Sequence, residues 1–250
     1  MAATTYAVTA GVATITLNQP ESRNALTPEL VSGLLDALTA ANADTDVRMV
    51  IVTNEGSTFC AGADLNGDSG DSAVALVSVM QAVMEAPKPV IGHINGHCMG
   101  GGVGLAAAFD ISVVRDDAKF AFSEARLGVA PAVISVVCLP KMRKADASEL
   151  FLRANRFSGS HAAKVGLVNH AVPVNDLAAT TQQIVTDVLA GGPQALIACK
   201  QLLADGSEVR SARFAEVAKL SRDLFASDEG REGVAAFKER RPARWNPAEK

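Results

Sequence analysis

The chain of 250 residues is poor in aromatic residues and has no long basic or apolar run. It contains one Trp and one Tyr, too few for the aromatic platform on which single-stranded nucleic acids stack. Its formal net charge is −4. The nearest approach to a basic cluster, at 238–244, is too short to predict nucleic-acid binding. We therefore expect no nucleic-acid partner.

Other absences bear on the cellular location. No run of about 18 apolar residues is present, so we expect no membrane-spanning helix and no membrane partner. The first ten residues lack the basic and apolar regions of a secretory signal. The 4 cysteines are far apart and form no C-x-x-C pair. These features predict a soluble, cytoplasmic protein with reduced thiols.

What the chain does have is abundant apolar surface in an alternating pattern. Hydrophobic residues make up 48% of the sequence, enough to exclude a disordered chain. Predicted strands and helices alternate up to about residue 145, which indicates α/β units with parallel pairing. The strands are expected at 6–8, 12–17, 47–53, 89–95, 111–115 and 119–122, and the helices at 27–38, 72–86 and 103–109. Residues 54–71 are expected to form a loop.

The second part of the chain is predicted to be mostly helical. After about residue 145 the only expected strand is 167–172, and helices are expected at 176–190, 194–203, 208–225 and 228–239. Gly191-Gly192-Pro193 interrupts this region and is typical of a boundary. We therefore predict an α/β core over 1–192 and a helical region over 193–250. No internal repeat is evident in the sequence.

Several motifs are tested and fail. Gly100–Gly104 follows a strand and opens a helix, but Leu105 stands where a dinucleotide-binding motif requires glycine. A G-x-S-x-G nucleophile elbow is absent, which argues against a serine hydrolase. His93 and His97 are four residues apart, but they straddle a strand and a turn, so structural roles are favoured over a metal site.

Two glycine-rich turns remain, and each follows an expected buried strand. Small residues let a backbone approach a ligand closely, and the first N–H groups of a helix are unpaired. Two backbone N–H groups that converge on one oxygen form an oxyanion hole. The turns occupy 59–65 (FCAGADL) and 95–102 (NGHCMGGG).

These two turns resemble signature segments of the enoyl-CoA hydratase/isomerase (crotonase) superfamily. Further segments that resemble the family run from TLNQP at 16–20 to EGVAAF at 232–237, so the likeness covers essentially the whole chain. It implies a spiral of ββα units with a helical C-terminal trimerisation region, and a homotrimer or a dimer of trimers. The implied substrate is an acyl-CoA thioester, with no cofactor beyond the coenzyme A of the substrate and a role in fatty-acid and lipid metabolism.

The resemblance also assigns site residues. The backbone N–H groups of Ala63 and Gly101 match the family's oxyanion hole, which would hold the thioester carbonyl and stabilise an enolate. Glu124 matches one of the two glutamates that serve the family's hydratases. The expected substrate- or CoA-binding residues are Arg23, Ala25, Ala61, Asp64, Leu65, Phe237 and Arg240, with Phe237 and Arg240 reaching the CoA of a neighbouring subunit.

Gly104 departs from the family pattern, because the other hydratase glutamate belongs at this position. The segments around 104 and 124–135 resemble the branched-chain or methylglutaconyl-CoA hydratase branch, which also tends to lack that glutamate. A hydratase is therefore favoured. A single glutamate would also suffice for Δ3–Δ2 isomerisation, and a non-catalytic acyl-CoA-binding protein is the third alternative. Gly104→Glu is expected to raise hydration of a simple substrate unless another side chain fills that space.

The group that would activate water stays open in the sequence. Asp68 and Asp71 lie on a loop that could close over the site, although solvated loop acids are favoured. Arg126 could meet a distal carboxylate of the substrate. A carboxyl group beside an apolar acyl tunnel would have its pKa raised by desolvation, which would suit Glu124 for proton transfer.

Overall fold

The computed structural model describes residues 2–64, 69–204 and 207–245. It begins with an antiparallel hairpin of β1 (Thr4–Thr9) and β2 (Val12–Leu17), as the alternating sequence predicts. β2 then pairs in parallel with β3 (Met49–Asn54). The remaining strands β5 (Val90–Ile94), β7 (Ile111–Arg115) and β10 (His170–Val172) complete a six-stranded sheet in the order β1-β2-β3-β5-β7-β10.

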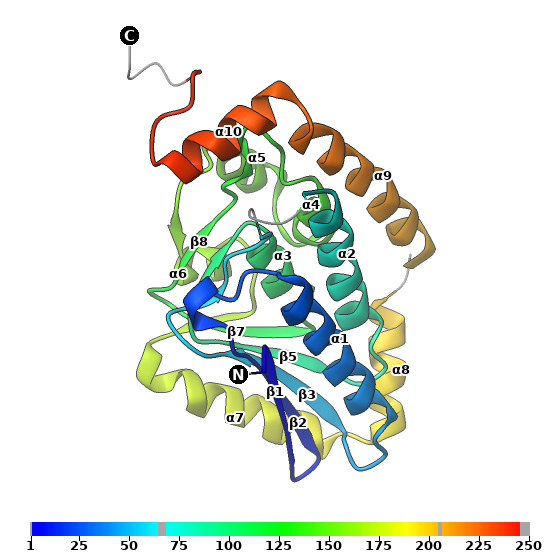
Figure 1. Ribbon diagram of the computed structural model, residues 1–250. Coiled ribbons are helices and arrows are strands. Elements are labelled where there is room, and N and C mark those ends of the chain that lie inside the picture. The colour runs from blue at the N-terminus through cyan, green and yellow to red at the C-terminus, as the bar shows by residue number, and fades with distance from the viewer. Residues whose placement is uncertain (1, 65–68, 205–206, 246–250) are drawn as a thin grey trace.

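A second sheet is made from short strands that follow those of the first. Its order is β4-β6-β8-β9, and its strands are β4 (Thr58–Cys60), β6 (His97–Met99), β8 (Lys119–Ala121) and β9 (Phe157–Ser158). Each of β3, β5 and β7 leads into a strand of the second sheet and then into a helix. The chain therefore winds as a spiral of ββα units (Figure 1), a structural repeat that the sequence did not reveal.

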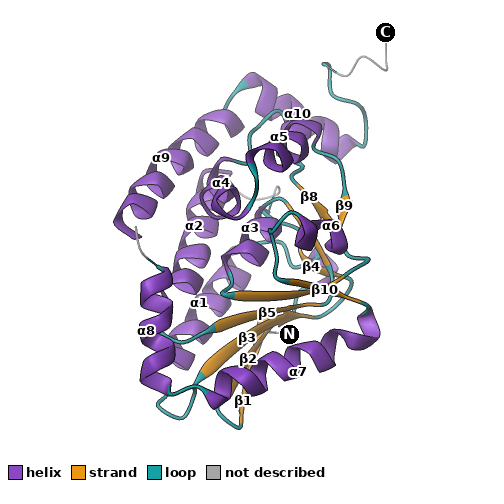
Figure 2. Cartoon of the chain, turned by 180° about the vertical axis from the view of Figure 1, so that it is seen from behind, coloured by secondary structure: helices purple, strands orange, loops and turns teal. Residues whose placement is uncertain are grey.

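Helices cover both faces of the six-stranded sheet. In β3, Val50 and Val52 belong to the main core, whereas Met49 packs with Val185 of α7 in a separate cluster. Alternate strand residues face opposite sides, so α1 (Pro28–Ala43) and α7 (Val174–Ala190) lie on opposite faces (Figure 2). Thr27 caps α1 with its side chain, which accepts from the Leu30 N–H, and Pro28 begins the helix, as predicted.

The other helices partly depart from the expected boundaries. α2 (Ser69–Glu85) begins three residues earlier than predicted, and α3 (Gly101–Ala108) begins at Gly101 and not at 103. β4, β6 and β9 are not predicted from the sequence, because strands of two or three residues give no periodicity. Also not predicted are the helices α4 (Ala132–Cys138), α5 (Lys144–Arg153) and α6 (Gly159–Lys164), together with the 3₁₀ helices η1 (Pro20–Ser22), η2 (Glu124–Leu127) and η3 (Leu139–Lys141).

The C-terminal helices pack back onto the α/β core of the same chain. They are α8 (Pro193–Leu203), α9 (Ser207–Phe225) and α10 (Asp228–Glu239). α9 contacts α2 and α4, and α10 contacts η2. Buried Lys200 ties α8 to the core, because its Nζ donates to Asp110 Oδ2 at 2.7 Å and to the Val83 carbonyl at 3.1 Å. Within the described residues no helix is long and apolar enough to cross a membrane.

Candidate active site

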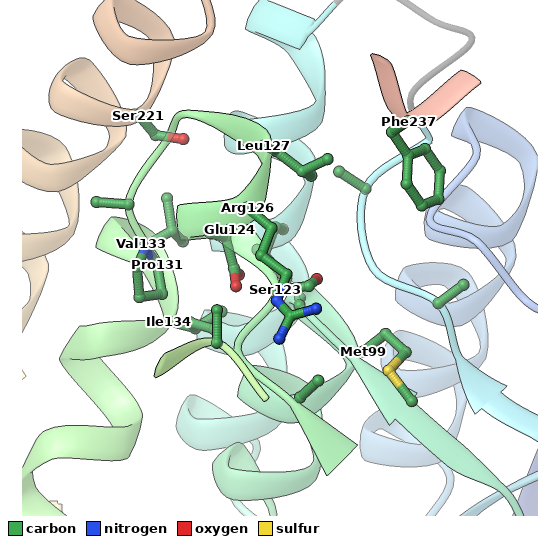
Figure 3. Close-up of a pocket in the computed structure, with 18 of the residues that line it drawn as sticks. Met99, Ser123, Glu124, Arg126, Leu127, Pro131, Val133, Ile134, Ser221 and Phe237 are labelled. Atoms are coloured by element: carbon green, nitrogen blue, oxygen red, sulfur yellow. The ribbon is translucent and has the colours of Figure 1, made fainter. Parts of the chain in front are cut away.

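A cavity of about 990 Å³ lies between the second sheet, η2, α4 and the C-terminal helices. Figure 3 shows the side chains that line it, with Met99 and Phe237 on one side and Val133 and Ser221 on the other. Of the predicted site residues, five line this cavity together with Glu124: Arg23, Ala61, Ala63, Gly101 and Phe237. The fold therefore gathers residues from widely separated segments at one place.

The two glycine-rich turns are packed against each other. Gly62 has a φ of +87°, and a Cβ at this position would lie 2.8 Å from the amide nitrogen of Gly101. A Cβ on Gly101 would in turn lie 3.3 Å from the Gly62 Cα. Only glycine fits such a contact at a positive φ, so the sequence GAD after Ala61 and the sequence GGG after Met99 bring two backbones together.

Ala63 and Gly101, which belong to the two turns in contact, both line the cavity. Gly101 is the first residue of α3, so its N–H has no acceptor within the helix. Among the residues that the structure describes, neither the Ala63 nor the Gly101 N–H donates a hydrogen bond. Both are thus available to a ligand that enters the cavity.

The carboxyl group of Glu124 lies beside the second turn. A Cβ on Gly100 would be 3.4 Å from Glu124 Oε1, and Glu124 Oε2 is shielded from solvent with no hydrogen-bond partner in the described chain. Because burial disfavours the charged form, desolvation raises the pKa of Glu124 to about 7, and its own backbone N–H opposes this shift. The carboxyl group is therefore close to half-protonated at neutral pH.

The position that departs from the family pattern is filled by an apolar side chain. A Cβ on Gly104 would lie 2.3 Å from Ile134 Cγ2 and 3.1 Å from Met80 Sδ. Gly104 is buried in α3, and Ile134 from α4 lines the cavity in front of it. The condition attached to the Gly104→Glu expectation is met, since the space is already occupied.

Three of the predicted binding residues that the structure describes do not line the cavity. Ala25 and Asp64 lie next to it in sequence but are outside its lining, as is Arg240, which follows α10 in a left-handed conformation. Leu65 and Asp68 lie outside the described residues. Asp71 belongs to α2, not to the expected loop, and its side chain is outside the described part.

Three further residues with basic side chains line the cavity and are not among the predicted site residues. His97, Lys119 and Arg156 all line it, and the imidazole pKa of His97 is lowered first by burial and further by the nearby cations Arg115, Lys119 and Arg156. His97 Nδ1 accepts from the Lys119 N–H at 3.0 Å. Because these residues come from three separate strands or loops, no local motif reveals them.

His93 and His97, which are four residues apart in the sequence, make different contacts in the structure. His93 Nδ1 lies 2.9 Å from Thr181 Oγ1 of α7, whereas His97 belongs to the cavity. In the described ranges, no group of three or more His, Cys, Asp or Glu side chains is arranged to hold a metal ion.

Comparison with known proteins places this architecture among related chains. A family model described as Enoyl-CoA hydratase/isomerase matches residues 7–248. A solved enoyl-CoA hydratase from Mycobacterium avium is 41% identical, with a TM-score of 0.92, over 98% of this chain and 100% of that one.

Curated relatives extend the likeness along the whole chain. A 2,3-dehydroadipyl-CoA hydratase of Escherichia coli is 31% identical over 91% of this chain and 92% of its own length. A mevalonyl-coenzyme A hydratase of Aspergillus fumigatus is 31% identical over 94% and 91%. These names differ in acyl group, so the comparisons leave the acyl group of this chain's substrate unassigned.

Proposed function

Because the chain belongs to the enoyl-CoA hydratase/isomerase family, we propose that it hydrates the double bond of a 2-enoyl-CoA thioester. The observation that carries this proposal is one juxtaposition. Two free backbone amides, from Ala63 and Gly101, share a cavity with the shielded carboxyl group of Glu124. The reaction needs a group that stabilises the enolate and a group that both accepts and donates a proton.

In the proposed mechanism the thioester carbonyl accepts hydrogen bonds from the Ala63 and Gly101 N–H groups. Water adds to C3, the C2=C3 π electrons move toward the carbonyl, and the developing negative charge falls on the oxygen held by the amides. Such preorganised donors act on the transition state, where the charge is greatest. The enolate then takes a proton at C2.

We assign both proton transfers to Glu124. Since Ile134 fills the space in front of Gly104, a second carboxyl group does not enter the cavity from that position. The Glu124 carboxylate takes a proton from the attacking water and returns a proton to C2, so the sum is addition of water. A pKa of about 7 suits a group that must accept and donate a proton in one cycle. Addition of water forms a C–O bond at C3 and a C–H bond at C2 without a net oxidation or reduction, so the proposal includes no cofactor beyond the coenzyme A of the substrate.

One observation favours a second candidate. A cavity with one carboxyl group at the reacting position is also sufficient for Δ3–Δ2 isomerisation, because Glu124 would remove a proton from C2 and return it to C4. The same two amides would stabilise the dienolate. The apolar Ile134 in place of the second acid is compatible with this reaction without any further group.

Purified protein mixed with crotonyl-CoA, 3-methylglutaconyl-CoA and a 3-enoyl-CoA separates the candidates. Loss of absorbance by the conjugated enoyl thioester reports hydration, and we expect it with at least one 2-enoyl substrate. Gain of that absorbance from the 3-enoyl substrate reports isomerisation. Binding of the CoA esters with neither change would contradict both and leave the non-catalytic acyl-CoA-binding protein.

We further propose that Arg23, at the cavity rim, contacts the CoA phosphates, and that Ala25, Ala61, Asp64 and Leu65 lie along the bound CoA. Phe237 lines the cavity of its own chain, while Arg240 is assigned to the CoA of a neighbouring subunit. The proposed assembly is a homotrimer or a dimer of trimers formed through 193–250. We place the protein in the cytoplasm and propose a role in lipid metabolism. Light scattering tests the assembly, and a monomer would contradict it.

A further inference from the structure

The turn that carries Glu124 is supported from outside the cavity by α10. η2 is only four residues long and ends with Leu127, so it offers little rigidity of its own. Gly233, in the middle of α10, lies directly on its backbone. A Cβ at Gly233 would be 2.2 Å from the Leu127 carbonyl oxygen and 2.7 Å from the Leu127 Cα. The helix and the turn are therefore in backbone-to-backbone contact.

A second contact holds the end of the same turn. Gly128 follows η2 with a φ of +69°, and its N–H closes the turn onto the carbonyl groups of Ala125 and Glu124. A Cβ at Gly128 would lie 2.5 Å from the Glu229 carbonyl oxygen of α10 and 2.9 Å from the Trp245 ring. Both ends of the contact are thus glycines that admit no methyl group.

The carboxylate of Glu232 fixes the chain beyond α10 to the helix. Glu232 is 7% exposed, and its two oxygens accept from Arg241 Nη1 at 2.7 Å and Nη2 at 3.1 Å. The backbone N–H of Arg244 also donates to Glu232 Oε1, at 3.0 Å. These bonds lower the pKa of Glu232 to about 2, with the Arg241 side chain as the largest cause. They return the chain to the core so that Trp245 reaches Gly128.

From these contacts we propose that α10 and residues 241–245 hold the turn of Glu124 in its reactive position. Gly233 and Glu232 are then positioning residues that act through the η2 backbone and do not touch the substrate. Phe237 of the same helix lines the cavity (Figure 3). One helix would then set both a wall of the cavity and the position of the Glu124 turn. A displacement of about 1 Å at a reacting group can cost about 100-fold in rate.

Substitution of Gly233 by Ala tests this most directly. We expect kcat with the turned-over enoyl-CoA to fall by about 10- to 100-fold with a much smaller change in KM. Gly192→Ala is the matched control, because a Cβ at Gly192 meets nothing nearer than 3.8 Å. It adds the same methyl group outside the contact, and its kcat should equal that of the wild type.

A second readout does not depend on turnover. Carbon-13 NMR of the glutamate carboxyl groups follows Glu124, whose pKa of about 7 depends on its burial and should fall toward 4.5 in Gly233→Ala as water reaches the displaced turn. The buried Cys138 thiol of α4 is the titratable group of that helix that interacts electrostatically with Glu124. Burial is the main cause that raises the pKa of Cys138, and the charge of Glu124 raises it further. A Glu124 pKa that stays at about 7, together with an unchanged kcat, in Gly233→Ala would overturn the proposal.

Two milder variants keep the test decisive if Gly233→Ala fails to fold. Trp245→Ala and Glu232→Gln leave the glycine contact intact and loosen its support, so we expect a fall in kcat of about threefold to tenfold and a smaller fall in the Glu124 pKa. Loss of stability in both without either change would show a purely structural role. The catalytic part rests on the proposed function; if the wild type turns over no enoyl-CoA, that function fails while the Glu124 pKa still decides the positioning.

Discussion

Two glycines one turn apart in the short helix α3 serve opposite purposes. At the start of the helix, Gly101 packs on Gly62 and lines the open cavity, and its N–H donates no hydrogen bond to the residues that the structure describes. One turn later, Gly104 is closed off, because Ile134 and Met80 fill the space where a side chain would stand. A glycine in this fold therefore means either a place kept for a ligand or a close contact between helices, and only the neighbours decide which.

The largest effect should come from substitution of Glu124, whose carboxyl group lies beside Gly100. Glu124→Gln removes the proposed proton carrier but keeps the shape of the side chain, so turnover should fall by about 10³-fold or more while CoA-ester binding is retained. Steady-state kinetics and calorimetric binding measure the two properties. Unchanged turnover in this variant would remove Glu124 from the mechanism.

The next largest effect should come from adding a methyl group at the contact between Gly62 and Gly101. A Cβ at Gly62 would lie 2.8 Å from the Gly101 nitrogen, so Gly62→Ala should displace one of the two amides. Loss of one oxyanion donor costs about 3–4 kcal/mol of barrier, or roughly 10²- to 10³-fold in kcat. A stopped assay with a thermal melt as control for folding checks this, and wild-type kcat would mean that the amide is not used.

A side chain added at Gly104 should lower stability without a gain in activity. Gly104→Glu drives a side chain into Ile134, and we expect a loss of about 1–3 kcal/mol in the free energy of unfolding with no rise in hydration. Gly104→Glu combined with Ile134→Ala opens room and should recover part of that stability. Denaturant unfolding measures both variants, and a single variant that is stable and more active would show that Ile134 moves aside.

The pKa of Glu124 also makes stability depend on pH. Between about 4.5 and 7 the native carboxyl group keeps its proton while the unfolded one has lost it, so stability falls as pH rises through this window. Glu124→Gln has no such titration, so the wild type should lose unfolding free energy relative to this variant as the pH rises from about 4.5 to 7. Chemical unfolding at several pH values measures it, and a flat difference would mean that Glu124 is not desolvated.

The smallest effect concerns the choice of substrate. Arg126 lines the cavity, and its guanidinium group forms no ion pair within the part of the chain that the structure describes. If it meets a distal carboxylate, Arg126→Gln should lower kcat/KM for 3-methylglutaconyl-CoA about tenfold more than for crotonyl-CoA. Equal losses with both substrates would assign Arg126 to the CoA portion.

The comparison of Gly101 with Gly104 also explains which parts of the site the sequence could predict. The glycine-rich turns at 59–65 and 95–102 and the cap at Thr27 could be predicted because local patterns encode them, whereas Glu124 was assigned through the family resemblance. The filling of the space at Gly104 by Ile134 could not be predicted, because residues 132–138 (AVISVVC) form an apolar run whose sequence shows no helical periodicity. The group of His97, Lys119 and Arg156 depends on strand pairing and leaves no local pattern.

The central claim is that the Ala63 and Gly101 amides bind one carbonyl oxygen beside Glu124. A crystal structure with a non-reactive acyl-CoA thioester tests it most directly. The account predicts a thioester oxygen about 2.7–3.1 Å from both amide nitrogens and the Glu124 carboxyl group next to C2 and C3. A carbonyl directed away from these amides, with the acyl chain remote from Glu124, would contradict it.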